Sequence, residues 1–252
     1  MHRFLLSSEA LTSAHVLLDK KESHHARRVL RVKPGEVVEV LDGAGGRYRA
    51  VVAGFKNELV GLSIERRLEN EGTGPSLTLA PSVIRPERME WMLEKACELG
   101  AEEWAPVLTE RSIIQLSRER WQAKAVRWRK IAQESCKQCG LSRLPQTAPP
   151  VPYKDMVRRI GLFDLTLIAT LTVSGTSLQE AFQKKPDAQS LLFLIGPEGD
   201  FTPQETQEAV REGAVPVSLG SLVLRAETAG LFALSAASFF YASSKTIRNK
   251  KK

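Results

Sequence analysis

The sequence contains few cysteines, and their positions do not fit a disulfide framework. Three occur among 252 residues, Cys97, Cys136 and Cys139. An odd number without regular spacing indicates a reducing compartment. Cys136 and Cys139 form a Cys-x-x-Cys pair, but no second pair completes a zinc site, and residues 130–140 read as a helix. We therefore interpret both cysteines as small residues at a helix end and predict no bound metal.

Long apolar runs are missing as well. No stretch of about 18 apolar residues occurs, which predicts no membrane span. The first residues lack the apolar run and small-residue cleavage site of a signal peptide, so we expect a cytoplasmic protein. The patterns GxxxxGK[ST] and GxGxxG are also absent, which argues against a P-loop and against an ordinary Rossmann fingerprint.

The composition is otherwise that of a globular protein with an excess of positive charge. The chain has 36 basic and 29 acidic residues, a net charge of +7, and this suits a polyanionic partner. The basic residues concentrate in residues 24–31 (HHARRVLR), 121–130 (WQAKAVRWRK) and 246–252 (TIRNKKK). We interpret the last segment as part of a solvated basic tail, residues 245–252.

Residues 1–70 are predicted to form a small β-barrel domain. Short β segments separated by turns occur at 2–6, 36–41, 47–53 and 59–65. The exception is a helix over 23–30, which Ser23 would cap and whose Val29 and Leu30 would face inward. The polar, glycine- and proline-containing residues 68–75 mark a domain boundary.

Residues 76–244 show a different periodicity, typical of a parallel α/β sheet. The predicted strands are residues 77–83, 104–108, 165–170, 191–195 and 215–219, and the predicted helices are 85–100, 118–140, 202–213 and 226–243. Continuous apolar runs fit parallel strands that are buried on both faces. Alternation of strands and helices predicts a sheet covered by helices.

Two loops follow consecutive predicted strands and have the character of ligand-binding loops. Gly196-Pro197-Glu198-Gly199-Asp200 is tight, and residues 220–225 (GSLVLR) are apolar except for one arginine. Open parallel sheets bind ligands beyond the carboxyl ends of their strands. Each loop alone reads as an ordinary turn. Together they predict a site for an adenine ring held through backbone groups, and not for a triphosphate.

The pair of loops resembles the SPOUT class of RNA methyltransferases, and the whole chain resembles the bacterial 16S ribosomal RNA uracil-N3 methyltransferase family. The matching segments are MHRFLL, HHARRVLRVKPGE, RMEWMLEKACELGAEEWAPVLTERS, KQCGLSRLP, LIGPEGDFTPQE and LGSLVLRAETA. The resemblance implies a PUA-like N-terminal barrel that docks RNA and an α/β SPOUT domain with a deep trefoil knot around S-adenosylmethionine. It also implies a homodimer with each site near the subunit interface, acting on the small ribosomal subunit.

The resemblance also implies which residues hold the cofactor. In this class the loops after three strands do so, and here they are residues 171–173, 196–199 and 219–224. The matching positions are Leu171, Gly196, Glu198, Gly199, Leu219, Gly220 and Leu224. Three positions depart from the usual pattern. Asp200 replaces a glycine, Ala226 replaces a common threonine, and Leu141 replaces a usual arginine, but none of these removes a cofactor loop.

Methylation of uracil N3 requires a group that handles the N3 proton, because the protonated nitrogen is a poor nucleophile. The site needs a base, or a cation that stabilises the developing anion. We predict that Arg225 is the cation, with a salt bridge to Glu198 or Glu227 as its alternative role. Glu198 and Glu227 are the candidate bases, and either could instead cap a helix or orient Arg225.

The predicted RNA-binding residues are His24, His25, Arg27, Arg28, Arg31, Arg111 and Arg143. The alternative for the first five is a solvated helix face with one packed histidine, and the last two could serve a dimer interface. A uracil inside an RNA fold would have to be extruded to reach the cofactor. Two other functions stay open: a SPOUT methyltransferase that acts on transfer RNA, and a non-catalytic RNA-binding assembly factor.

Overall fold

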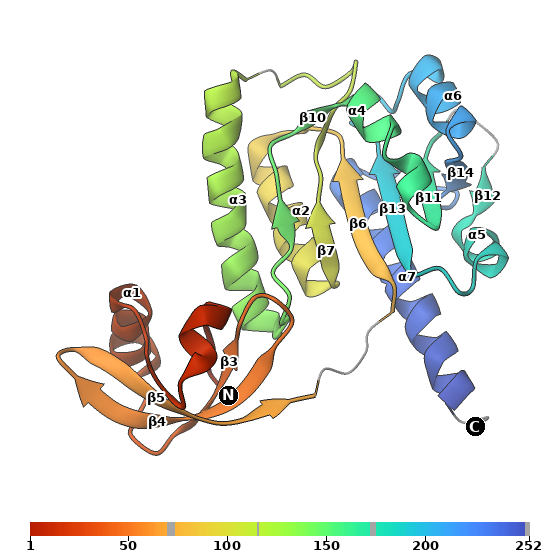
Figure 1. Ribbon diagram of the computed structural model, residues 1–252. Coiled ribbons are helices and arrows are strands. Elements are labelled where there is room, and N and C mark those ends of the chain that lie inside the picture. Colours follow the sequence, from red (N-terminus) through yellow and green to blue (C-terminus); the bar gives the residue numbers. More distant parts are fainter. Residues whose placement is uncertain (70–73, 115, 172–174, 250–252) are drawn as a thin grey trace. The chain divides into compact units, whose positions relative to one another are not determined.

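The computed structural model describes residues 1–69, 74–114, 116–171 and 175–249 (Figure 1). Its contacts divide the chain into two units. The N-terminal unit comprises Met1–Gly72 with Gln133–Leu144, and the C-terminal unit comprises Thr73–Ala132 with Pro145–Lys252. The segment 133–144 carries the end of a long helix and a following turn. Nothing in its sequence periodicity indicates that it packs with the first 70 residues.

The N-terminal unit is built on a five-stranded sheet with the order β1-β3-β4-β5-β2. The strands are β1 (Arg3–Leu5), β2 (His15–Leu17), β3 (Val37–Leu41), β4 (Arg47–Lys56) and β5 (Leu59–Leu68). Strands β1 and β3 are parallel, and the other pairs are antiparallel. All four predicted strands occur, whereas the short β2 was not predicted. Apolar side chains of the sheet, with Phe4 the largest, form the core of this unit together with Leu18, Ala26 and Val32.

The predicted helix over 23–30 is wrong in its start and in the inward orientation of Val29, whereas Leu30 packs against the core of the unit as predicted. Helix α1 (Lys20–His24) begins earlier, and the side chain of Asp19 caps it. Ser23 lies buried within it. Its hydroxyl donates to the carbonyl oxygen of Leu18 and accepts from the N–H of Val60. A π-helical turn, His25–Leu30, follows. A π turn contains more residues than an α turn, so it rotates later side chains away from the face that α periodicity predicts, and Val29 is 62% exposed.

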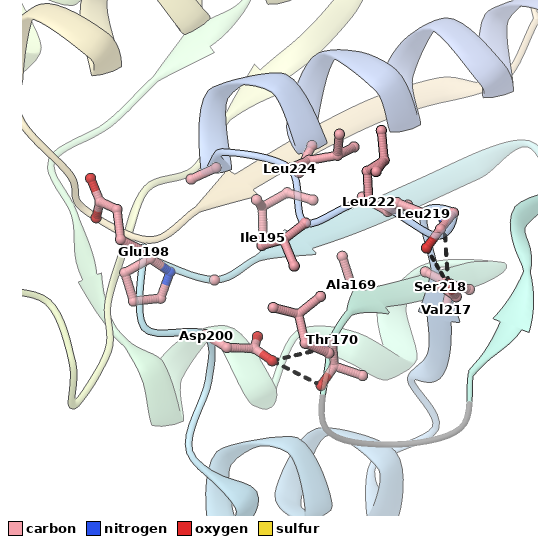
Figure 2. Close-up of a pocket in the computed structure, with 17 residues that line it drawn as sticks. Ala169, Thr170, Ile195, Glu198, Asp200, Val217, Ser218, Leu219, Leu222 and Leu224 are labelled. Atoms are coloured by element: carbon pink, nitrogen blue, oxygen red, sulfur yellow. Dashed lines mark hydrogen bonds between the residues drawn. The ribbon is translucent and has the colours of Figure 1, made fainter.

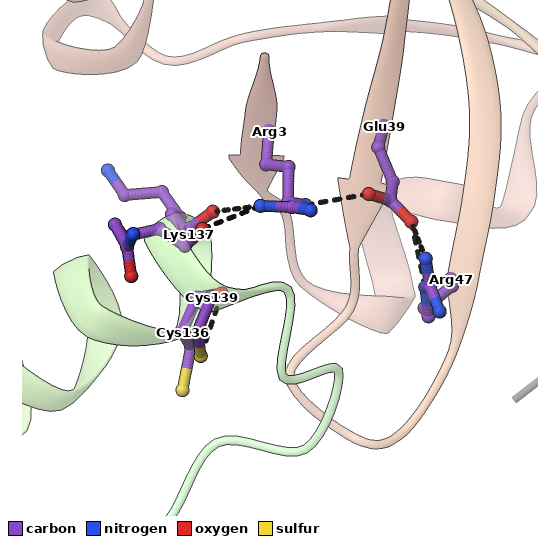
Figure 3. Close-up of polar contacts among 7 residues, drawn as sticks. Arg3, Glu39, Arg47, Cys136, Lys137 and Cys139 are labelled. Atoms are coloured by element: carbon purple, nitrogen blue, oxygen red, sulfur yellow. Dashed lines mark hydrogen bonds and ion pairs between the residues drawn. The ribbon is translucent and has the colours of Figure 1, made fainter. Parts of the chain in front are cut away.

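Arg3 joins the sheet of this unit to the end of the long helix (Figure 3). The carboxylate of Glu39 is fully buried and accepts hydrogen bonds from Arg3 Nε, at 2.7 Å, and from Arg47. Arg3 Nη1 also donates to the carbonyl oxygens of Lys137 and Gln138, which the helix end leaves without intrahelical partners. Burial alone would raise the pKa of Glu39, but the two arginines outweigh it and lower the pKa.

The C-terminal unit contains a seven-stranded sheet with the order β12-β14-β11-β13-β6-β7-β9. The strands are β6 (Ser76–Pro81), β7 (Ala101–Trp104), β9 (Gln146–Thr147), β11 (Leu165–Ala169), β12 (Thr176–Ser177), β13 (Ser190–Ile195) and β14 (Val215–Ser218). Every pairing is parallel. Residues 191–195 are buried without a break, as expected for a strand covered on both faces. The mixed α/β class with a parallel sheet is therefore confirmed.

The predicted strand 104–108 is wrong. Strand β7 ends at Trp104, and β8 (Val107–Leu108) pairs instead with β10 (Val151–Pro152) in a separate two-stranded sheet. Pro106 explains the break, because proline has no backbone N–H to continue a ladder of hydrogen bonds.

Helices cover the sheet of the C-terminal unit (Figure 1). They are α2 (Pro86–Glu98), α3 (Arg118–Cys139), α4 (Tyr153–Val157), α5 (Leu178–Lys184), α6 (Pro203–Arg211) and α7 (Ala226–Asn249). The capping box of Thr202 and Glu205 opens α6 as predicted. Helix α7 continues beyond the predicted end, so residues 245–249 of the predicted tail are helical, and residues 250–252 lie outside the described part. None of the helices described is long and apolar enough to cross a membrane.

Candidate functional site

Three loops of the C-terminal unit meet at the carboxyl edge of the parallel sheet. They follow β11, β13 and β14, and β11 lies between the other two strands. The loops border a pocket (Figure 2). The lining residues are Ala169, Thr170, Leu171, Ile195, Gly196, Pro197, Glu198, Asp200, Val217, Ser218, Leu219, Gly220, Leu222, Val223, Leu224, Ala226 and Ala229.

The pocket lining combines many apolar side chains with two acidic ones and with the hydroxyl groups of Thr170 and Ser218. Among the described lining residues, Glu198 and Asp200 are charged and none is basic. This contrasts with the net charge of +7 of the chain. Apolar walls with negative charge suit a ligand that combines a flat apolar ring with positive charge, and they disfavour a polyphosphate.

Six of the seven predicted cofactor-binding residues line this pocket, and Gly199 does not. The six are Leu171, Gly196, Glu198, Leu219, Gly220 and Leu224. The carbonyl oxygen of Gly199 instead accepts a hydrogen bond from Arg111, which also reaches the carbonyl oxygen of Phe201. Arg111 thus braces the loop after β13. Residues 172 and 173 of the first predicted loop lie outside the described residues.

The candidate catalytic residues do not form one cluster. Arg225 is exposed, whereas Glu198 and Glu227 both pair with Arg88, which was not predicted from the sequence. Arg225 is exposed and stands between two pocket residues, Leu224 and Ala226. Arg88 Nη1 lies 3.1 Å from Glu198 Oε1, and Arg88 Nε lies 3.7 Å from Glu227 Oε1. Among the described contacts, both acids therefore pair with Arg88 rather than with Arg225.

Glu227 is the most buried of these charged groups. It occupies the first turn of α7, and 11% of its side chain is exposed. Its Oε2 atom is buried and has no hydrogen-bond partner within the described structure. Helix α2, which carries Arg88, begins just beyond the carboxyl end of β6, and β6 is the neighbour of β13. This order of strands brings Arg88 to the site, and local sequence patterns do not predict it.

The predicted RNA-binding residues of the N-terminal unit lie on and around the π-helical turn. His24, Arg28 and Arg31 are exposed. Arg27 is folded back, with its guanidinium 5.3 Å from the centre of the Phe55 ring. By its position in the sequence Arg143 falls in the predicted domain 76–244, whereas contacts group it with the N-terminal unit. It is exposed in the N-terminal unit, where its backbone bridges to that of Gly43.

Cys136 and Cys139 both lie near the end of α3, as predicted. Cys136 is buried, and burial, with a smaller contribution from Cys139, raises the pKa of its thiol to about 12. Within the described residues, no three histidine, cysteine or acidic side chains lie together in a way that could hold a metal ion.

Comparison with known proteins assigns both parts of the chain. Residues 73–238 match the family model of an RNA methyltransferase domain, and residues 18–60 match that of an RNA methyltransferase PUA domain. The chain is 31% identical over 235 residues to ribosomal RNA small subunit methyltransferase E of Synechocystis, covering 93% of this chain and 76% of the relative.

Two solved structures resemble the chain over 96% of its length. A ribosomal RNA small subunit methyltransferase E from Neisseria gonorrhoeae, bound to S-adenosyl methionine, is 28% identical with a TM-score of 0.84, covering 96% of this chain and 98% of that one. A methyltransferase from Legionella pneumophila, with the bound cofactor SAM, is 30% identical with a TM-score of 0.81, covering 96% and 97%. The chain therefore belongs to the RNA methyltransferase family that includes the ribosomal RNA small subunit methyltransferase E proteins.

Proposed function

We propose that this protein uses S-adenosylmethionine to methylate N3 of a specific uridine in 16S ribosomal RNA of the small subunit. The observation that carries the proposal is the acidic, apolar pocket at the carboxyl edge of three parallel strands, in a chain whose relatives are small-subunit ribosomal RNA methyltransferases. The finer features of the class, a deep trefoil knot in the C-terminal unit and a closed PUA-like barrel, belong to the same proposal.

The pocket residues fit the cofactor in shape and charge. Leu219, Leu222 and Leu224 offer apolar surface for an adenine ring, and the glycines of the loops let backbone groups approach it. The cofactor, when bound, supplies an electrophilic methyl group on a positively charged sulfur. Placing that methyl group in line with the uracil nitrogen is the main work of such a site.

The protein's own residues then handle the N3 proton. Arg225 stabilises the developing uracil anion. It is exposed between two residues of the pocket lining, and the described ion pairs give it no carboxylate partner. Glu198 or Glu227 takes the proton. Glu227 has the oxygen without a partner, and Glu198 stands in the pocket lining.

The RNA contacts in this proposal come mainly from the N-terminal unit. His24, Arg28 and Arg31 are exposed there, and His25, Arg27 and Arg143 lie in the same unit. Arginines position the RNA through its phosphates, and histidine can stack on a base. Arg111 acts as a brace of the cofactor loop and offers its remaining N–H groups to RNA.

We further propose that the protein is a homodimer. Helix α7 exposes Phe232 and Phe239, which lie seven residues apart and so near one face, and 77% of Phe239 is exposed. Leu222 and Val223 of the pocket lining are also exposed, 76% each. Exposed apolar side chains beside a site are expected to be covered by a partner. Light scattering should give twice the chain mass, and Phe239→Glu should give the monomer.

A methyl-transfer assay tests the function. The protein is incubated with labelled cofactor and either unmethylated small subunits, bare 16S RNA or transfer RNA, and the labelled nucleotide is identified. Label on uridine N3 of 16S RNA supports the proposal, and label on transfer RNA favours the alternative enzyme. Cofactor binding without transfer to any RNA favours an assembly factor. Arg225→Ala with full transfer would refute the role of Arg225.

A further inference from the structure

Asp200 closes one pocket loop onto another. We propose that it is a positioning residue for the first cofactor loop and that its charge makes the site prefer the positively charged methyl donor to the uncharged-sulfur product. The inference rests on the proposed function, because it takes S-adenosylmethionine as the ligand. The Asp200 side chain would thus both hold the shape of the pocket and contribute to its preference for donor over product.

The hydrogen bonds of Asp200 carry the positioning role (Figure 2). Its Oδ2 atom accepts from the backbone N–H of Leu171 at 2.8 Å and from the hydroxyl of Thr170 at 3.2 Å. Its Oδ1 atom accepts from the N–H of Phe201 at 2.8 Å. The carboxylate therefore links the loop after β13 to the loop after β11, and both loops line the pocket.

The backbone around Asp200 holds this carboxylate in place. Its φ of 62° is in the left-handed region, which aspartate and asparagine adopt more readily than most residues do. The N–H of Asp200 closes a turn onto the carbonyl of Pro197 at 2.9 Å. At Gly196 an added Cβ would lie 3.1 Å from Asp200 Oδ1, so the glycine leaves the room that the carboxylate fills.

Of the two acidic residues in the pocket, Asp200 is the one without a described positively charged partner. Glu198 pairs with Arg88, whereas the described partners of Asp200 are two N–H groups and a hydroxyl. In methyl transfer the carbon–sulfur bond breaks, the methyl group bonds to N3, the bond electrons stay on sulfur, and the N3 proton leaves to a base. The product has thus lost one positive charge. A nearby carboxylate favours binding of the donor and release of the product.

Calorimetric titration with S-adenosylmethionine and S-adenosylhomocysteine tests both roles. Asp200→Asn tolerates the left-handed backbone and keeps one acceptor oxygen but has no charge. We expect its ratio of donor to product affinity to fall about fivefold, the size of a partly screened charge pair. Asp200→Gly keeps the turn but loses every side-chain hydrogen bond. We expect its affinity for both ligands to fall by about tenfold or more.

Controls separate this inference from the proposed function. Asp155→Asn removes an exposed acid of the same unit that pairs with Arg158, and it should leave both affinities unchanged. Amide hydrogen exchange adds a second readout, because the Leu171 N–H should exchange faster in Asp200→Gly than in the unchanged protein. An unchanged affinity ratio in Asp200→Asn overturns the charge role, and unchanged affinities and exchange in Asp200→Gly overturn the positioning role. Failure of the unchanged protein to bind the donor refutes the proposed function itself.

Discussion

Replacing Arg88 by methionine should destabilise the C-terminal unit mainly through Glu227. Methionine keeps the apolar stem and the helix propensity of arginine but removes its charge. The pair with Glu198 contributes little, about 0–1 kcal/mol, because 45% of the Glu198 side chain is exposed. Glu227 is 11% exposed and would lose the cation beside it, which costs about 1–3 kcal/mol. We therefore expect a loss of about 1–4 kcal/mol in the free energy of unfolding, most of it from Glu227.

Urea denaturation tests this assignment when the free-energy cost of the methionine substitution is measured both in the unchanged protein and in Glu227→Gln. Glu227→Gln removes the buried charge, so the methionine substitution should cost under about 1 kcal/mol when made in that background. Affinity for S-adenosylmethionine provides a parallel reading, because Arg88 holds Glu198 at the pocket. If the methionine substitution costs the same in both backgrounds, Glu227 does not depend on Arg88 and the reasoning is wrong.

Two further predictions concern the N-terminal unit. Because the folded pKa of Glu39 is lowered, its stabilising effect is present above the ordinary carboxyl pKa and is lost as pH falls through the folded value. Glu39→Gln should therefore be less stable than the unchanged protein near pH 7, and urea midpoints should converge as the pH falls; a constant difference would contradict this. Because burial raises the pKa of Cys136 to about 12, iodoacetamide at mildly alkaline pH should label the half-buried Cys139 and spare Cys136 until denaturant is added. Equal labelling rates in the folded protein would contradict the burial of Cys136.

Much of the fold follows from local patterns in the sequence. Continuous apolar runs such as residues 191–195 predict buried parallel strands, and the capping box of Thr202 and Glu205 fixes the start of α6. The loops that line the pocket were predicted because glycines and apolar residues follow such strands. These features depend on residues close together in the chain.

Features that depend on distant residues could not be predicted. Arg88 meets Glu198 and Glu227 only because β6 lies beside β13, although more than 100 residues separate them along the chain. Residues 133–144 join the N-terminal unit through the Arg3 side chain, which donates to a carbonyl oxygen at the helix end, and through the backbone bridge between Arg143 and Gly43. Val29 was predicted to face inward but is exposed, because α periodicity does not hold across the π-helical turn.

The central claim is that this protein methylates uridine N3 in 16S ribosomal RNA. Mass spectrometry of that RNA from cells with and without the protein, and from cells that carry Asp200→Gly, tests it most directly. We expect one N3-methyluridine to disappear without the protein and to be reduced when cells carry the glycine variant. An identical uridine methylation profile with and without the protein would refute the proposed function.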